Sequence, residues 1–83
     1  MRIDNIGRGE KGKRVEIGDI VLFFSYKTLV GFKTPRDGVV CCENIWGSVT
    51  GGHLNCIEPD HSLRLDPPTF MIKVDKLMGR FKY

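Results

Sequence analysis

The chain has 83 residues, enough for one small domain and too few for two independently folded ones. Its formal charge of +3 is low for a nucleic-acid-binding protein, so the charge permits nucleic-acid binding but does not imply it. Three cysteines cannot all pair, no charged and apolar leader opens the sequence, and no stretch has the apolar length of a membrane span, so we expect a soluble cytoplasmic protein.

The N-terminal segment, residues 1–14, mixes glycines with basic side chains and carries little apolar area. Such a composition predicts a flexible basic arm, followed by a single β-rich domain over residues 15–83. A mobile basic arm is one way for a protein to reach phosphate groups. Its candidate phosphate contacts are Arg8, Lys11, Lys13 and Arg14.

The densest run of β-branched and aromatic residues lies at 18–33, so the core must form around it. Successive side chains of a strand point to opposite faces of the sheet, and from Ile20 to Phe24 the side chains on both faces are apolar. This pattern is typical of a strand at the centre of a sheet. Polar residues 25–28 then predict a tight turn, and residues 29–32 predict the returning strand of a hairpin.

The meander continues after the hairpin. Residues 34–38 contain a proline and a glycine in positions typical of a turn, and residues 39–43 predict a third strand. Cys41 and Cys42 are adjacent in it, so their side chains should point to opposite faces of the sheet.

Two structures remain open for residues 48–57. A short helix would place Val49, His53 and Ile57 on one face, at i, i+4 and i+8, with Ser48 or Thr50 as a local cap. Two adjacent glycines cost such a helix about 1 kcal/mol each relative to alanine, so a loop followed by a short strand is the alternative.

The C-terminal third predicts two more strands. Residues 62–66 alternate like an edge strand, which would allow a homodimer across a two-fold axis. Two prolines interrupt it, and residues 69–74 predict the final strand, with Phe70, Ile72 and Val74 on one face. A last helical turn should end at Gly79. We therefore expect a mostly β or α+β domain: one antiparallel sheet or barrel of five or six strands with at most two short helices.

Two polar motifs flank the third strand. The first is Ser25-Tyr26-x-Thr28-x-Val30, and the second is Trp46-x-Ser48-x-Thr50-x-x-His53-Leu54-Asn55. Together they resemble a family of small uncharacterised proteins from phages, archaea and their mobile elements. The resemblance covers roughly residues 19–57 and departs at Gly51, where a second threonine is usual, and at Gly52. It implies a phage-type origin and, by association with small phage proteins, an inhibitor of host defence of the anti-CRISPR kind.

These features favour a non-enzymatic binding protein that occupies the surface of a host protein or nucleoprotein complex inside the host cell. Aromatic residues outside the strong strands are the natural anchors of such a contact, with basic residues at its rim. The candidate contact residues are Trp46, Tyr26, Lys27, Arg36, Lys76 and Arg80. Trp46 could instead cover the core.

Two other functions compete with this one. A small nucleic-acid-binding domain would use the basic arm and the C-terminal basic residues. A zinc module would draw its ligands from Cys41, Cys42, His53, Cys56 and His61. No Cys-x-x-Cys pair is present and only one of two adjacent cysteines could ligate, so we favour buried cysteines, no metal and no cofactor. No catalytic motif is present either, and we expect His53 to fix a loop through hydrogen bonds.

Overall fold

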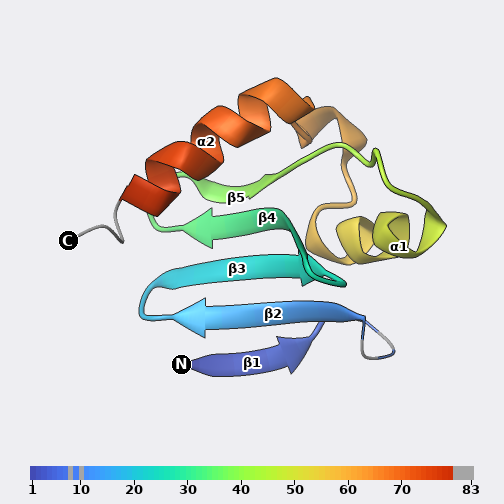
Figure 1. Cartoon of the computed structure of the whole chain (residues 1–83), viewed down its shortest axis with the longest axis horizontal. Helices are drawn as coiled ribbons and strands as arrows, with labels where there is room; N and C mark the ends of the chain where they lie inside the picture. The colour runs from blue at the N-terminus through green and yellow to red at the C-terminus, as the bar shows by residue number, and fades with distance from the viewer. Residues whose placement is uncertain (8, 10, 80–83) are drawn as a thin grey trace.

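The structure, a computed structural model, describes residues 1–7, 9 and 11–79 and contains one five-stranded antiparallel sheet with two α-helices (Figure 1). This architecture confirms the expected mostly β or α+β domain, in its open-sheet form. The strands are β1 (Arg2–Asn5), β2 (Gly12–Ile17), β3 (Ile20–Ser25), β4 (Thr28–Thr34) and β5 (Gly38–Cys41). Each strand pairs with the next along the chain, so the sheet is a meander with β3 at its centre, as predicted.

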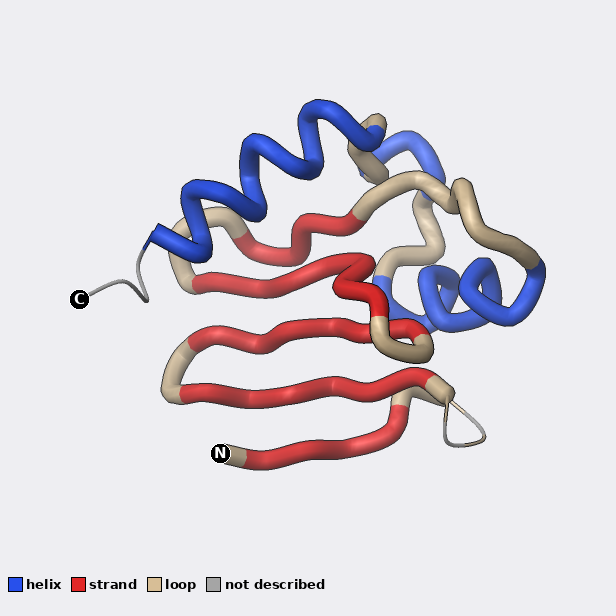
Figure 2. Tube along the Cα trace, viewed as in Figure 1, coloured by secondary structure: helices blue, strands red, loops and turns tan. Residues whose placement is uncertain are grey.

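The two helices, α1 (Ser48–Ile57) and α2 (Pro67–Gly79), contribute to two different cores, which draw on opposite faces of the sheet. In projection, α2 runs beside β5 and α1 lies near the β3–β4 turn (Figures 1 and 2). A short 3-10 helix, η1 (His61–Leu63), lies between them in sequence. Buried α2 side chains pack with Ile20 and Leu22, whereas Leu54 of α1 packs with Val21 and Phe23. The alternation along β3 therefore supplies both cores, which is why its residues are apolar on both sides.

A β-bulge in β4 aims Val30 and Phe32 at different cores. The register shifts between Phe23 and Phe24, because Phe23 pairs with Gly31 and Phe24 pairs with Leu29, which leaves Val30 as the extra residue. Val30 then joins the α1 core, while Phe32 joins the α2 core. Cys41 and Cys42 likewise point to opposite faces, as their adjacency predicted.

The N-terminal segment is not a flexible arm where the structure describes it. Arg2–Asn5 forms β1 and pairs with β2, which itself begins at Gly12. Ile6 is buried in the α1 core, so a single apolar residue anchors a segment whose composition suggested mobility. Arg8, one of the candidate phosphate contacts, lies outside the described residues.

The predicted final strand over residues 69–74 is wrong, because these residues belong to α2. Phe70, Val74 and Leu77 share a helical period and are the buried residues of α2, whereas Ile72 is 58% exposed. Pro67 is the first helical residue, a position where the missing N–H costs nothing and the fixed φ favours the helix. The two prolines therefore start a helix.

The predicted edge strand over residues 62–66 is also wrong. η1 occupies its first half, and Asp60 caps η1 by accepting a hydrogen bond from the backbone N–H of Ser62. Leu65 forms a parallel bridge with Cys42, in which Leu65 N–H donates to Cys41 O and Glu43 N–H donates to Leu65 O, both at 2.8 Å. This segment thus extends the end of β5, and the strand expected to mediate a homodimer does not form.

Neither α-helix, within residues 1–7, 9 and 11–79, has the length and apolar character that crossing a bilayer requires.

Candidate functional site

The candidate contact residues divide between two ends of the sheet. Tyr26 and Trp46 line a pocket beside the β3–β4 turn, whereas Arg36 and Lys76 line a cleft beside the β4–β5 turn. One turn precedes β4 and the other follows it, so the two sites lie at opposite ends of this strand and are separate (Figure 1). Lys27 is the exposed neighbour of Tyr26 in its turn, and Arg80 lies outside the described residues.

The pocket at the β3–β4 turn, here called the aromatic pocket, has a volume of about 280 Å³. Its lining residues are Ser25, Tyr26, Thr28, Trp46, Gly47, Ser48, Val49 and Thr50. Three large apolar side chains among them are exposed: Tyr26 by 52%, Trp46 by 42% and Val49 by 49%. Trp46 therefore faces solvent and does not cover the core. The exposed Val49 also corrects the predicted helix face, since α1 buries Thr50, His53 and Leu54.

Tyr26 stands at the pocket because of the turn in which it lies. Its φ of 57° is in the left-handed region, the one such value of a residue other than glycine in the described chain. This conformation is uncommon for tyrosine and suits the tight two-residue turns that join antiparallel strands. The Tyr26 N–H donates to Lys11 O at 2.6 Å, and Lys11 Nζ lies 5.9 Å from the centre of the Tyr26 ring. A backbone bond and a cation–π contact thus hold Tyr26 beside β2.

Asn44 fixes Trp46 at the start of α1. Asn44 Oδ1 accepts hydrogen bonds from the N–H groups of Trp46 at 3.0 Å and Gly47 at 3.2 Å. Its Nδ2 donates to Gly47 O at 2.9 Å. A Cβ on Gly51 would lie 2.9 Å from that Nδ2, so glycine at this position leaves room for Asn44. Gly51, which departs from the family motif, therefore allows Asn44 to make its hydrogen bonds to Trp46 and Gly47.

Two residues that line the aromatic pocket, Ser25 and Thr50, are buried, and together with buried His53 they form a polar network. Ser25 Oγ lies 2.8 Å from Thr50 Oγ1 and 2.8 Å from His53 Nδ1, and it hydrogen-bonds both. The imidazole lies against Gly12 of β2, where a Cβ would come within 2.8 Å of the ring. This Ser25–Thr50–His53 network joins the hairpin to α1. His53 was expected to fix a loop, whereas its Nδ1 hydrogen-bonds a strand residue, Ser25, and so links α1 to β3.

Sequence reasoning missed the roles of Ser25 and Thr50. The sequence suggests Thr50 as a local cap, whereas α1 begins after Gly47 without a side-chain cap. Two features of the sequence could have pointed to these roles: the Ser25 hydroxyl at the end of an apolar strand, and the Thr50 hydroxyl in the second motif. Nothing in their spacing links residues that are 25 positions apart.

Ser25 and His53 stand at the distance of a nucleophile and its general base. The remaining geometry differs from that of a catalytic triad, since the third residue, Thr50, bonds to the serine and not to the imidazole. All three side chains are buried, which suits a network that joins the hairpin to α1.

The candidate zinc ligands are dispersed. Cys41 and Cys42 belong to different cores, and Cys56 is exposed on α1. In the described part of the chain, no group of three or more histidine, cysteine or acidic side chains is arranged to hold a metal. Burial raises the pKa of both core thiols above the ordinary value, which favours their neutral form.

The basic residues expected to form a phosphate-binding arm lie on β2 or beside it. Lys13 Nζ donates to Asn5 Oδ1 at 2.6 Å, and Arg14 forms an ion pair with Glu16. Since Lys11 stacks on Tyr26, three of the four candidate phosphate contacts have partners within the protein.

Comparison with known proteins places this fold in a family. A family of unknown function (DUF8033) matches residues 2–65, which include the whole sheet, α1 and η1. No curated protein and no solved structure matches the chain. Because the match covers most of the chain, including every residue of the aromatic pocket, the protein belongs to the family of unknown function DUF8033.

Proposed function

We propose that this protein is a non-enzymatic binding protein, and that its aromatic pocket receives an apolar side chain of a protein partner. One observation carries the proposal: Tyr26, Trp46 and Val49 are all exposed around a single pocket, although each has an apolar side chain that burial would stabilise. Contiguous exposed apolar groups with a polar border are typical of interaction sites.

The pocket is organised before any partner arrives. Asn44 fixes the backbone of Trp46, and the Ser25–Thr50–His53 network holds two of the lining residues. A partner would therefore lose little conformational entropy from this side of the contact, which raises affinity for a given buried area. Tyrosine and tryptophan are also the residue types that most often dominate the free energy of protein interfaces.

The partner class that we propose is a host protein or nucleoprotein complex in the host cytoplasm, blocked by occupation of its surface. Support for this class comes from the resemblance to small phage and mobile-element proteins and from the chemistry of the pocket. The residues that line the aromatic pocket are uncharged, and exposed apolar anchors in such a setting favour a protein surface over a phosphate backbone.

The test is quantitative binding to a partner captured from nuclease-treated host lysate and then purified. Trp46→Ala and Tyr26→Ala should each weaken binding by about 30-fold or more, the effect of losing an interface anchor. Ile72→Ala, which removes an exposed side chain from α2, should leave affinity unchanged. Equal affinities for the Trp46, Tyr26 and Ile72 variants, all folded by circular dichroism, would refute a role for the pocket.

A further inference from the structure

A second site lies at the other end of the sheet, and here it is called the basic cleft. It has a volume of about 680 Å³, within the range of roughly 300–1,000 Å³ that small-molecule sites occupy. Its lining residues are Asp19, Thr34, Pro35, Arg36, Asp37, Lys73, Lys76 and Leu77. Two elements supply its cations: the β4–β5 turn carries Arg36, and α2 carries Lys73 and Lys76.

Both walls of the basic cleft are anchored in the protein. Buried Thr34 accepts a hydrogen bond on Oγ1 from the Asp37 N–H at 3.0 Å, which fixes the turn that bears Arg36. On the other wall, buried Leu77 fixes the stretch of α2 that carries the two lysines. The three cationic side chains therefore project from backbones that do not need to reorganise on binding.

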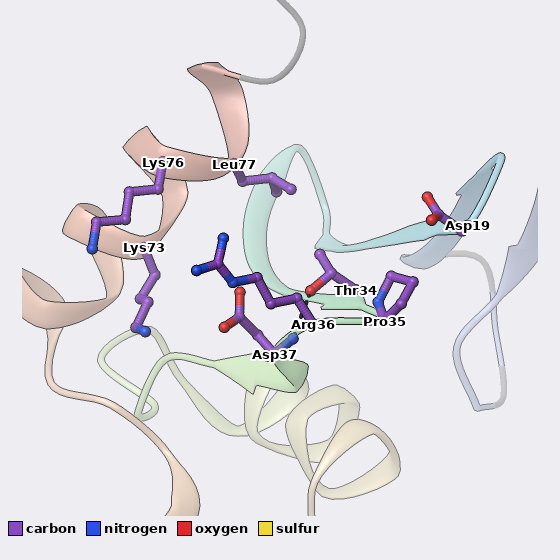
Figure 3. Close-up of a pocket in the computed structure, with 8 residues that line it drawn as sticks. All are labelled: Asp19, Thr34, Pro35, Arg36, Asp37, Lys73, Lys76 and Leu77. Carbon is purple, nitrogen blue, oxygen red and sulfur yellow. Dashed lines mark hydrogen bonds between the residues drawn. The ribbon is translucent and has the colours of Figure 1, made fainter.

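Positive charge exceeds negative charge on the side of the cleft that faces α2. Figure 3 shows Arg36 reaching towards α2, where Lys73 and Lys76 lie, with Asp37 beside it and Asp19 apart on the far side of the turn. Three cations thus share this side with one carboxylate. Lys73 and Lys76 are three residues apart on α2, a spacing at which like charges repel. The ion pairs of the described residues both lie outside the cleft: Arg2 with Asp4, and Arg14 with Glu16.

We propose that the basic cleft binds a small anion carrying two or more phosphate groups. A guanidinium offers paired donors that match phosphate oxygens, and two ammonium groups supply compact charges beside it. An anion with several charges would relieve the repulsion among all three cations at once. The three cations line one concavity, which favours a compact ligand over a nucleic-acid backbone or an acidic protein face.

This site is independent of the aromatic pocket. The two sites share no residue, and Lys73, Lys76 and Leu77 lie beyond the residues matched by the family. Failure of one proposal therefore leaves the other standing.

Isothermal titration calorimetry with inorganic tripolyphosphate tests the proposal directly. We expect saturable binding that Lys76→Gln weakens at least tenfold and that Lys73→Gln weakens similarly. Lys76→Arg, which keeps the charge, should retain binding. The matched control is Lys27→Gln, which removes the same charge from the exposed turn at the opposite end and should bind like the wild type.

Absence of saturable binding to tripolyphosphate would overturn the proposal, as would equal weakening by Lys27→Gln. A single-stranded oligonucleotide and an acidic peptide serve as parallel ligands. Binding of either one without binding of tripolyphosphate would assign the cleft to that macromolecule and reject the small phosphate ligand. Thermal unfolding of each variant checks that it is folded at the temperature of the titration.

Discussion

Ser25 Oγ and His53 Nδ1 lie 2.8 Å apart, and this buried hydrogen bond joins the central strand to α1. The same oxygen also bonds to Thr50, so one hydroxyl satisfies two polar side chains of the helix. Since α1 has no side-chain cap and contains two glycines, its position depends on these contacts and on Leu54.

Ser25→Ala should therefore destabilise the protein. The substitution leaves Thr50 and His53 buried without this partner, and a buried polar group that loses its hydrogen bond costs about 1–3 kcal/mol. Urea unfolding followed by circular dichroism measures the loss. Ser48→Ala is the control, because Ser48 is an exposed serine at the first position of α1 and makes no side-chain capping bond. Similar unfolding midpoints for the two variants would contradict the structural role of the network.

A pair of glycine substitutions tests the packing of α1. At Gly12 a Cβ would lie 2.8 Å from the His53 ring, so Gly12→Ala should displace the imidazole and lower stability. Gly52 lies within α1, and a Cβ added there would have no atom within 4 Å. Gly52→Ala should instead stabilise the protein by about 1 kcal/mol, through helix propensity alone.

Opposite signs for these two Gly→Ala changes, measured by thermal or urea unfolding, are the expected result. Stabilisation by both variants would mean that the His53 ring does not rest on β2. Destabilisation by both would mean that α1 is not helical at residue 52.

Strands β3, β4 and β5 were predictable because their signal is local. Period two from Ile20 to Phe24 specifies a strand with two apolar faces, and the turn residues on either side specify antiparallel neighbours. The bulge at Val30 was not predictable, because it depends on which core each side chain of β4 can enter. Strands β1 and β2 were both missed: β1 is held by its pairing with β2 and by the burial of Ile6, and β2 is held by its pairing with β3.

The helix α2 shows why a short apolar pattern is ambiguous. Phe70 and Val74 satisfy both period two and the i, i+4 spacing of a helix, and the two interpretations are separated by the exposure of Ile72 and the burial of Leu77. The aromatic pocket was predictable in part: the motifs identified its residues, but no sequence spacing indicates that Tyr26 and Trp46 meet.

Alanine substitutions on α2 distinguish its helical and extended forms. Leu77→Ala removes a buried side chain from the α2 core and should cost about 2–5 kcal/mol of unfolding free energy. Ile72→Ala removes a side chain that is 58% exposed and should change stability by no more than about 0.5 kcal/mol. A strand over these residues would bury Ile72 with Phe70, so a large loss from Ile72→Ala in urea unfolding would reject the helix.

The two core cysteines predict how stability depends on pH. Burial raises the pKa of Cys41 and of Cys42 above the ordinary value of 9.0, so each thiol binds its proton more tightly in the folded state. The resulting stability is complete below pH 9 and declines as the pH rises above that value, where unfolded chains ionise these thiols first.

Urea unfolding between pH 7 and about pH 10 measures this decline, since the upper limit stays near the ordinary lysine pKa. The informative quantity is the difference in this decline between the wild type and a variant that lacks one of the buried thiols. Cys41→Ala removes one buried thiol and should flatten the decline, even though its stability at neutral pH is lower. Parallel curves for the wild type and Cys41→Ala would show that Cys41 ionises as readily in the folded chain as in the unfolded one.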